Sequence, residues 1–295
     1  MNRPDIAEPP VFLIEPLVRA ALAEDLGRAG DLTTDTIVPA AARARGVLNA
    51  RKAGVVAGLG VAAVAFRLLD LEARIEVARP DGATVGANEP IAVVSGRARA
   101  LLSAERVALN FLCHLSGVAT ATREIVDAVK GHRARIACTR KTTPGLRALE
   151  KYAVRLGGGA NHRFGLDDGV LLKDNHILVA GGIGRAIERA KMALGHMVKV
   201  EIEVDRLDQL GQALAAGADA ILLDNMTPAQ MREAVEIIGG RAIVEASGRI
   251  TAETAPEIAA TGVDVISCGW ITHSAPILDI GLDFEDSLSG RSGRP

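Results

Sequence analysis

Short apolar segments recur about every 22 residues in the second half of the chain, and this repeat constrains the fold more than any other feature. It runs through Val200, Ile221, Ile243 and Val265, with helix-forming stretches between them. One strand and one helix fill a repeat of this length, and a series of such units builds a parallel sheet or an α/β barrel. The sequence therefore predicts an α/β fold beyond residue 131.

The hydrophobic pattern also places the individual elements. In the repeat region we expect strands at Arg135–Thr139, Val170–Lys173, Val198–Val204, Ala220–Leu223, Ala242–Glu245 and Val263–Cys268, and helices at Leu207–Ala216, Pro228–Ile238 and Ala252–Ala260. Before it we expect strands at Gly46–Arg51, Arg74–Ala78 and Pro90–Val94, and helices at Pro16–Leu26, Val61–Leu69 and Ala98–Lys130. Gly117 is expected to divide the last of these helices in two.

Composition narrows the possible functions. Hydrophobic residues make up 48% of the 295 residues, enough to bury a large core. The net charge of −2 and the aromatic content of 2% argue against a nucleic-acid partner, because such surfaces are basic and stack bases on aromatic rings. The three cysteines form no CxxC motif, and no segment is long and apolar enough to span a membrane. We therefore expect a cytoplasmic protein without disulfides, a zinc site or a membrane partner.

The segment Gly58-Leu59-Gly60-Val61-Ala62-Ala63 matches the GxGxxA pattern of dinucleotide-binding folds. That pattern requires a βαβ unit and an acidic residue about 20 positions further on, and the sequence offers no clear example of both. We interpret these glycines as part of a tightly packed turn.

Polar residues follow nearly every expected strand of the repeat region. They are Arg140 and Lys141, Lys173, Asp224 and Asn225, Ser247 and Gly248, and Gly269. In parallel α/β folds the carboxyl ends of the strands meet at one edge, where ligands bind. We therefore expect the functional site at this edge.

The strand around residue 202 alternates strictly between apolar and acidic residues. Its apolar side chains are expected to face the outer helices, so Glu201 and Glu203 would point into the fold. Buried carboxylates need partners, and Lys173, Lys199 and Arg140 are candidates. Asp224 could share a divalent cation with Glu203. The alternative is a solvated edge strand with two exposed glutamates.

Cationic residues gather between Thr139 and His176. Arg140 and Arg163 could hold a planar dicarboxylate through paired hydrogen bonds. Lys141 and Lys173 suit pyrophosphate oxygens as compact charges. The alternative, charges on a solvated surface, explains exposed helical positions better than residues at strand ends.

The last two expected strands are followed by residues suited to a phosphate group. Ser247 and Gly248 follow one strand and Gly269 follows the other, with His273 four residues later. Barrels often bind phosphate at this place through backbone N–H groups. The alternative for His273 is a structural role, which is more common for a lone histidine.

The segment CTRKTTPGLRALEKYAVRLGGGANHRFGLDDGVLLKDNHI, residues 138–177, resembles the core of the quinolinate phosphoribosyltransferases, also called carboxylating nicotinate-nucleotide pyrophosphorylases. The resemblance extends over residues 15–284 through supporting motifs. These are Glu24-Asp25, Gly30–Thr34, Glu105-Arg106, Asn110–Leu112, Ser116–Thr120, Glu201–Val204, Leu222–Asn225, Glu245–Gly248 and Thr272–Ser274.

The resemblance implies a type II phosphoribosyltransferase fold. An N-terminal α/β sandwich domain would span residues 1–116, with residues 275–295 packing back on it, and an incomplete α/β barrel would span 117–274. The implied reaction joins quinolinate to phosphoribosyl pyrophosphate and yields nicotinate mononucleotide, pyrophosphate and CO2, with Mg²⁺ required. The family resemblance also implies a homo-oligomer, a dimer or a hexamer, in which each site borrows an arginine.

The resemblance assigns a role to each candidate residue. Arg140, His162 and Arg163, together with Arg106 of the partner subunit, would hold the quinolinate carboxylates. Lys141 and Lys173 would contact phosphoribosyl pyrophosphate and the substrate acid. Glu203 and Asp224 would position Mg²⁺ and the ribose hydroxyls, and Ser247, Gly248, Gly269 and His273 would hold the 5′-phosphate.

Several positions depart from the family pattern. Ala246 stands where Ser is usual, Arg249 where Gly or Asn is usual, and Trp270 where a small residue is usual. These departures affect the phosphate loops rather than the reaction. Cys113-His114 replaces a frequent Gln-Arg pair. Three rival functions remain open: a Schiff-base aldolase with Lys173 as nucleophile, a related transferase of the same fold, and an anion-binding module without catalysis.

Overall fold

The computed structural model describes residues 6–285, which form two compact units. Unit 1 consists of the chain up to Ala121, of Pro144–Gly157 and of the chain from Ala275; unit 2 consists of Thr122–Thr143 and Gly158–Ser274. Residues 144–157 thus group with the first unit, whereas the sequence placed them in the barrel domain. Residues 286–295, expected to pack on the first domain, lie outside the described part of the chain.

Unit 1 is built on an antiparallel sheet in the order β12-β1-β5-β3. These strands are β1 (Arg43–Ala50), β3 (Arg74–Val77), β5 (Pro90–Arg97) and β12 (Ile280–Phe284); β2 (Gly54–Val55) and β4 (Thr84–Val85) form a separate pair. The helices are α1 (Val11–Leu26), α2 (Leu32–Ile37), α3 (Leu59–Leu69), α5 (Arg147–Gly157) and the greater part of α4 (Ala98–Ala128). Leu48, Phe66, Ile91 and Leu112 are fully buried and bring sheet and helices into one core.

The first helix is longer than predicted, because α1 begins at Val11 and contains Pro16. Ile14, Val18 and Leu22 are buried at four-residue spacing, so the stripe that the helix buries starts ahead of the proline. The proline removes one backbone hydrogen bond, and the packing of this stripe maintains the helix across it.

The predicted division of α4 at Gly117 is wrong, since the helix runs without a break from Ala98 to Ala128. Gly117 instead allows the backbone of residues 276–278 to come close. A Cβ atom at position 117 would lie 2.2 Å from the carbonyl oxygen of Pro276 and 2.8 Å from the Cα atom of Ile277. The glycine is thus a packing requirement of unit 1 and not a helix break.

The GxGxxA segment forms the start of α3 and has its own partner within unit 1. Gly58 is left-handed, with φ 101°, and its N–H group and that of Leu59 donate to the Asp81 carboxylate. The strand before it, β2, pairs antiparallel with β4, so no βαβ unit is present there. This geometry agrees with the interpretation as a packed turn.

Unit 2 contains a six-stranded parallel sheet in the order β6-β11-β10-β9-β8-β7. Its strands are β6 (Arg135–Ala137), β7 (Val170–Leu172), β8 (Val200–Val204), β9 (Ala220–Asp224), β10 (Ile243–Ser247) and β11 (Val265–Ser267). All six predicted strands are confirmed, with ends that shift by up to two residues. Among the described residues β6 and β7 do not pair, so the sheet is an open arc and not a closed barrel.

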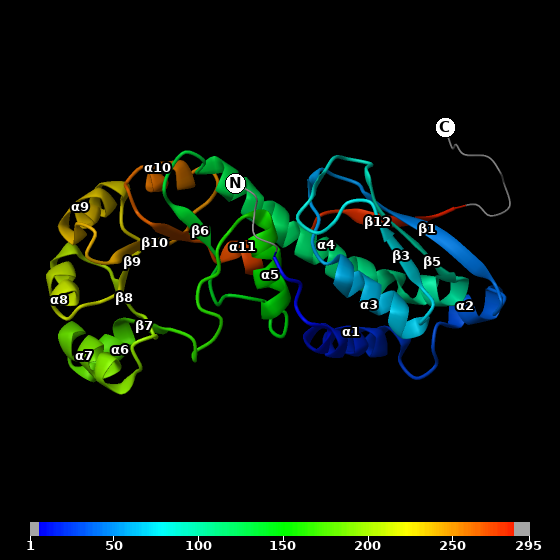
Figure 1. The fold of residues 1–295 in the computed structure, drawn as a ribbon, viewed down its shortest axis with the longest axis horizontal. Coiled ribbons are helices and arrows are strands. Elements are labelled where there is room, and N and C mark those ends of the chain that lie inside the picture. Colours follow the sequence, from blue (N-terminus) through cyan, green and yellow to red (C-terminus); the bar gives the residue numbers. More distant parts are fainter. Residues whose placement is uncertain (1–5, 286–295) are drawn as a thin grey trace. The chain divides into compact units, whose positions relative to one another are not determined.

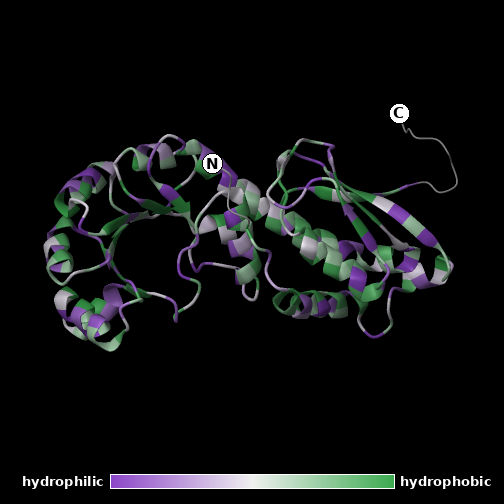
Figure 2. Cartoon of the chain, viewed as in Figure 1, coloured by the Kyte–Doolittle hydropathy of each residue, from purple (hydrophilic) through white to green (hydrophobic). Residues whose placement is uncertain are grey.

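Helices cover the outer side of this arc, as Figure 1 shows for α7 to α10. The helices of this unit after Gly158 are α6 (Asp174–Ala180), α7 (Ile183–Ala193), α8 (Leu210–Ala215) after a 3-10 turn at Leu207–Gln209, α9 (Pro228–Ile238), α10 (Ala255–Ala259) and the short α11 (Trp270–His273). In Figure 2 hydrophobic and hydrophilic residues alternate around these helices. The buried Val200, Ile202 and Val204 of β8 show that the apolar side of that strand is covered, as predicted.

The close approach at Gly117 predicts a large cost for a single methyl group. Gly117→Ala is expected to lower the free energy of unfolding by roughly 1–3 kcal/mol, because the added carbon overlaps the backbone of residues 276–278. Urea unfolding followed by circular dichroism measures the change. Gly211→Ala in α8 is the matched control: a Cβ atom there meets nothing within 4 Å, and helix propensity makes that change neutral or stabilising. Equal effects of the two changes would contradict the packing role.

Candidate active site

A cavity of about 530 Å³ lies at the carboxyl ends of the parallel strands in unit 2. Eight of the twelve residues predicted from the sequence line it: Arg140, Lys141, His162, Arg163, Lys173, Glu203, Asp224 and Ser247. Each strand supplies a residue at or just after its end, because parallel strands direct all their carboxyl ends to the same edge. The predicted edge of the sheet is therefore where the structure brings these side chains together.

Arg140 and Arg163 both line this cavity. Arg163 Nη1 donates to the Gly169 carbonyl oxygen at 2.9 Å. Burial, and then the charge of Arg140, lower the pKa of Arg163 from its ordinary value. Two neighbouring cations in a partly dehydrated cavity form a site that an anion stabilises, because it removes their repulsion.

The two predicted lysines occupy different surroundings. Lys173 follows β7, and its ammonium group forms an ion pair with the Glu203 carboxylate. Lys141 is exposed and passes close to Gly269, where an added Cβ atom would lie 3.0 Å from Lys141 Cδ. The missing side chain at Gly269 therefore leaves room for the lysine beside the cavity. Lys199, the other expected partner of the acidic strand, pairs with Asp219 instead.

Glu203 and Asp224 lie on adjacent strands and both line the cavity. Glu203 is opposite Leu222 in the β8–β9 register, so Asp224, two residues further along β9, lies on the same side of the sheet. Two carboxylates suit Mg²⁺, which usually takes one or two protein carboxylates and completes its shell with water and substrate phosphates. The donor set thus fits the expected ion.

The expected phosphate residues lie at the ends of β10 and β11. Gly248 is left-handed, with φ 122°, and an added Cβ atom would lie 2.4 Å from Asn225 Oδ1, so only glycine fits. Trp270, a departure from the family pattern, donates through Nε1 to the Ile250 carbonyl oxygen at 2.8 Å and thereby ties the two loops together. His273 Nδ1 is 2.6 Å from Ser274 Oγ, and Gly248, Gly269 and His273 are not among the residues that line the cavity.

Arg106 belongs to unit 1, so the cavity described here is formed without it. It is exposed on α4. The other departure near it, Cys113-His114, is satisfied within unit 1: Cys113 Sγ lies 3.5 Å from the Ile280 carbonyl oxygen, and His114 Nε2 lies 2.9 Å from Glu150 Oε1.

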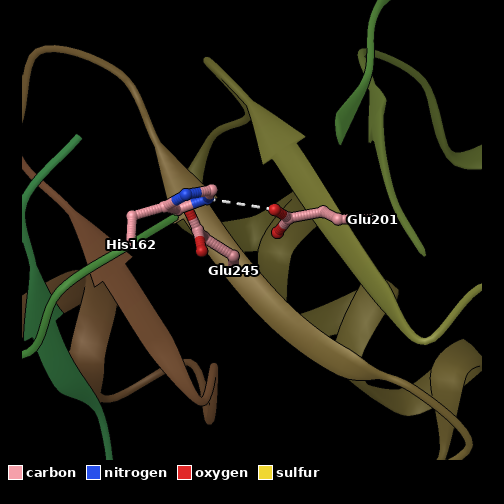
Figure 3. A group of neighbouring side chains, drawn as sticks. All are labelled: His162, Glu201 and Glu245. Atoms are coloured by element: carbon pink, nitrogen blue, oxygen red, sulfur yellow. Dashed lines mark hydrogen bonds and ion pairs between the residues drawn. The ribbon is translucent and has the colours of Figure 1, made fainter. Parts of the chain in front are cut away.

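His162 forms a cluster with two buried residues, Glu201 and Glu245, inside the strand arc (Figure 3). His162 Nε2 is 3.0 Å from Glu201 Oε2 and 3.6 Å from Glu245 Oε1. Sequence reasoning placed Glu201 inside the fold but did not pair it with His162, and it gave Glu245 no role. The available signal was an acidic residue within each of two apolar strands, both facing inward.

Comparison with family models shows which family the chain belongs to. Residues 31–116 match the family model of the quinolinate phosphoribosyl transferase N-terminal domain, and residues 118–283 match that of its C-terminal domain. The chain belongs to this family. The resemblance seen in the sequence and the fold that it implied, the type II phosphoribosyltransferase fold, are thus confirmed.

Individual quinolinate phosphoribosyltransferases resemble the chain over nearly its whole length. The probable carboxylating nicotinate-nucleotide pyrophosphorylase of Bacillus subtilis is 44% identical over 92% of this chain and 93% of its own. The Mycobacterium leprae enzyme of that name is 45% identical over 90% and 95%. NadC from Streptococcus pyogenes, a solved structure, superimposes with a TM-score of 0.90 at 41% identity, over 95% of this chain and 100% of its own.

The state of the Glu245 carboxyl group is expected to make the stability of the folded chain depend on pH. Burial, reinforced by the charge of Glu201, raises its pKa to about 7 from an ordinary 4.5. Between these values the folded chain holds more protons than the unfolded chain, so the free energy of unfolding falls as the pH rises. Glu245→Gln cannot ionise and removes this fall.

Melting curves of the native chain and of Glu245→Gln at pH 5 and pH 8 measure the effect. The Tm of the variant relative to the native chain is expected to rise by roughly a few degrees from the lower to the higher pH. Glu233→Gln, on the exposed side of α9, serves as the control. A relative Tm that stays constant with pH for Glu245→Gln would contradict the raised pKa.

Proposed function

We propose that this chain transfers the phosphoribosyl group of phosphoribosyl pyrophosphate to quinolinate, with loss of CO2 and formation of nicotinate mononucleotide and pyrophosphate. One observation carries the proposal in a chain of this family. A single 530 Å³ cavity presents Arg140, Arg163, Lys141 and Lys173 together with Glu203 and Asp224. Two polyanionic substrates require the cationic side chains, and the positive charge that develops on the ribose requires the carboxylates.

The cationic residues bring the substrates together. Quinolinate carries two negative charges and the sugar diphosphate carries several, and each like pair costs about 4 kcal/mol at 4 Å and an effective dielectric constant of 20. Arg140 and Arg163 bind the planar dicarboxylate as forks, with His162 beside them, and Lys141 and Lys173 bind diphosphate oxygens. Ser247 holds the 5′-phosphate with Gly248, Gly269 and His273.

Bond exchange at the ribose proceeds without a covalent enzyme intermediate. The pyridine nitrogen forms a bond to ribose C1 while the bond from C1 to pyrophosphate breaks. Positive charge develops on the ribose, and the carboxylates of Glu203 and Asp224 stabilise it. The ring nitrogen is then cationic, so when the adjacent carboxylate leaves as CO2, its electron pair remains on the ring carbon and accepts a proton.

Mg²⁺ is the proposed cofactor, held by Glu203 and Asp224 together with the diphosphate. When bound, it neutralises charge on the leaving pyrophosphate. The three cysteines, Cys113, Cys138 and Cys268, are buried and form no disulfide, which supports a reducing compartment, and we place the enzyme in the cytoplasm. No helix among residues 6–285 is long and apolar enough to cross a membrane.

Release of ¹⁴CO2 from carboxyl-labelled quinolinate tests the reaction. We expect release only when phosphoribosyl pyrophosphate is present, loss of activity in EDTA, and recovery with Mg²⁺. Failure to release CO2 would reject the function, and activity in metal-free buffer would reject the metal. Trapping of a keto substrate by borohydride on Lys173 would favour the aldolase alternative.

We further propose that the enzyme is a homo-oligomer, a dimer or a hexamer, in which Arg106 of the partner subunit completes each site. Arg106→Ala and Lys141→Ala are each expected to be inactive, because each lacks one charge that holds substrate. Mixed dimers of the two variants would contain one site with both defects and one intact site. Activity that reappears in verified heterodimers checks the proposal, and its absence there would refute the shared site.

A further inference from the structure

Two hydrogen bonds fix the ring of His162. The Arg163 backbone N–H donates to Nδ1 at 2.8 Å, and Nε2 lies 3.0 Å from Glu201 Oε2. Because Nδ1 accepts a hydrogen bond, the proton of a neutral ring is on Nε2, which donates it to Glu201. The two bonds therefore link the Glu201 carboxylate, through the imidazole, to the backbone of Arg163.

This link crosses the open arc of strands. Ala160 bridges to Ala137 of β6, with its N–H donating to the Ile136 carbonyl oxygen at 2.7 Å, so residues 160–163 continue from that edge. Glu201 lies on β8, which is four strands away in the sheet order. In Figure 3 the imidazole of His162 points from its own segment toward Glu201 and Glu245. The segment that carries Arg163 is thus tied to the far strands of the arc.

Glu201 acts from outside the substrate cavity. It lines a second cavity of about 320 Å³, at the amino ends of the strands, and is not among the residues that line the 530 Å³ cavity. His162, Arg163 and Glu245 line both. Glu201 therefore acts on bound substrate through residues that line both cavities, and its hydrogen bond to His162 leads to Arg163.

A metal ion is the obvious alternative for two buried glutamates and a histidine whose ligand atoms lie within 4.8 Å of one another. A metal-bound histidine normally donates its other ring N–H to an acceptor. Here the other nitrogen, Nδ1, faces the Arg163 N–H, which is a donor. A metal at Nε2 would require a proton on Nδ1 and would break that bond, so the geometry favours a hydrogen-bonded strut.

Arg163 needs such a strut because the positive charge of its neighbour Arg140 repels its guanidinium group. The positive charge of Arg140 acts against the Arg163 guanidinium, whereas the charges of Asp168 and Glu201 favour it. In the absence of substrate, repulsion would drive the two guanidinium groups apart. A fork binds a carboxylate well only when its orientation is already fixed.

We propose that Glu201 is a positioning residue for quinolinate binding, which holds His162 in the tautomer that fixes the Arg163 backbone and so aims the Arg163 guanidinium into the cavity. This inference rests on the proposed function. It assigns Glu201 an effect on the KM for quinolinate and none on the KM for phosphoribosyl pyrophosphate.

Two substitutions of Glu201 separate hydrogen bonding from filling of space. Glu201→Leu removes the acceptor, and we expect the quinolinate KM to rise about tenfold, with kcat and the other KM changed by less than about threefold. Glu201→Gln keeps an acceptor oxygen and is expected to stay within about threefold of the native quinolinate KM. Glu233→Leu, an exposed site on α9, is the control.

Arg163→Lys shows how far the quinolinate KM rises when the paired hydrogen bonds of the guanidinium group are lost. It is expected to raise the quinolinate KM at least as strongly as Glu201→Leu, because an ammonium group cannot make paired hydrogen bonds. Since both changes act on the same group, the double variant should fall short of the product of the two single effects. Independent, multiplicative effects would overturn the proposal.

The ¹⁵N resonances of His162 give a readout that catalysis does not influence. We expect a proton on Nε2 in the native chain and in Glu201→Gln, and a loss of this fixed tautomer in Glu201→Leu. A proton on Nδ1, or a shift of Nε2 when Mg²⁺ or Zn²⁺ is added to chelator-treated protein, would overturn the proposal in favour of a metal site.

The outcomes also separate this inference from the function on which it rests. If the native chain does not release CO2, the function fails whatever the resonances show. If it does release CO2 and Glu201→Leu changes the quinolinate KM no more than Glu233→Leu, only the positioning role fails.

Discussion

Crowding of like charge at one edge of a parallel sheet is the constraint on which the site depends. Arg140 and Arg163 line one cavity, and the pKa of Arg163 is lowered by burial and by its neighbour. The charges of Asp168 and of Glu201 on β8 favour the Arg163 guanidinium, and Glu203 on the same strand pairs with Lys173. Each acidic side chain on β8 has a cationic or hydrogen-bonding partner, so the strand contributes electrostatics as well as packing.

Periodicity predicted the architecture of unit 2 well because each strand there is a short apolar run between helices. It predicted unit 1 less well, since β2 and β4 are two residues long and β12 lies far from its neighbours in sequence. The errors at Pro16 and Gly117 have one cause. Both residues break helices by propensity, and at both positions tertiary packing outweighs propensity.

The site could be predicted where a single rule applied, namely that residues after parallel strands converge. That rule brought Lys173 and Asp224 together although 51 positions separate them, counting from 173 to 224. It could not find the contact between His162 and Glu245, because His162 follows no named strand and its position depends on the bridge between Ala160 and Ala137. The family resemblance supplied His162 as a site residue, but what its ring nitrogens contact depends on the folded structure.

The pairing of β12 with β1 has a consequence for synthesis of the chain. β1 lies between β5 and β12, and its second neighbour consists of residues 280–284, which follow it much later in the sequence. A nascent chain on the ribosome therefore carries an open strand edge at residues 46–50 until residues 280–284 have been made. Throughout that interval β1 is a place where two growing polypeptides can pair with each other, a route to aggregation during translation.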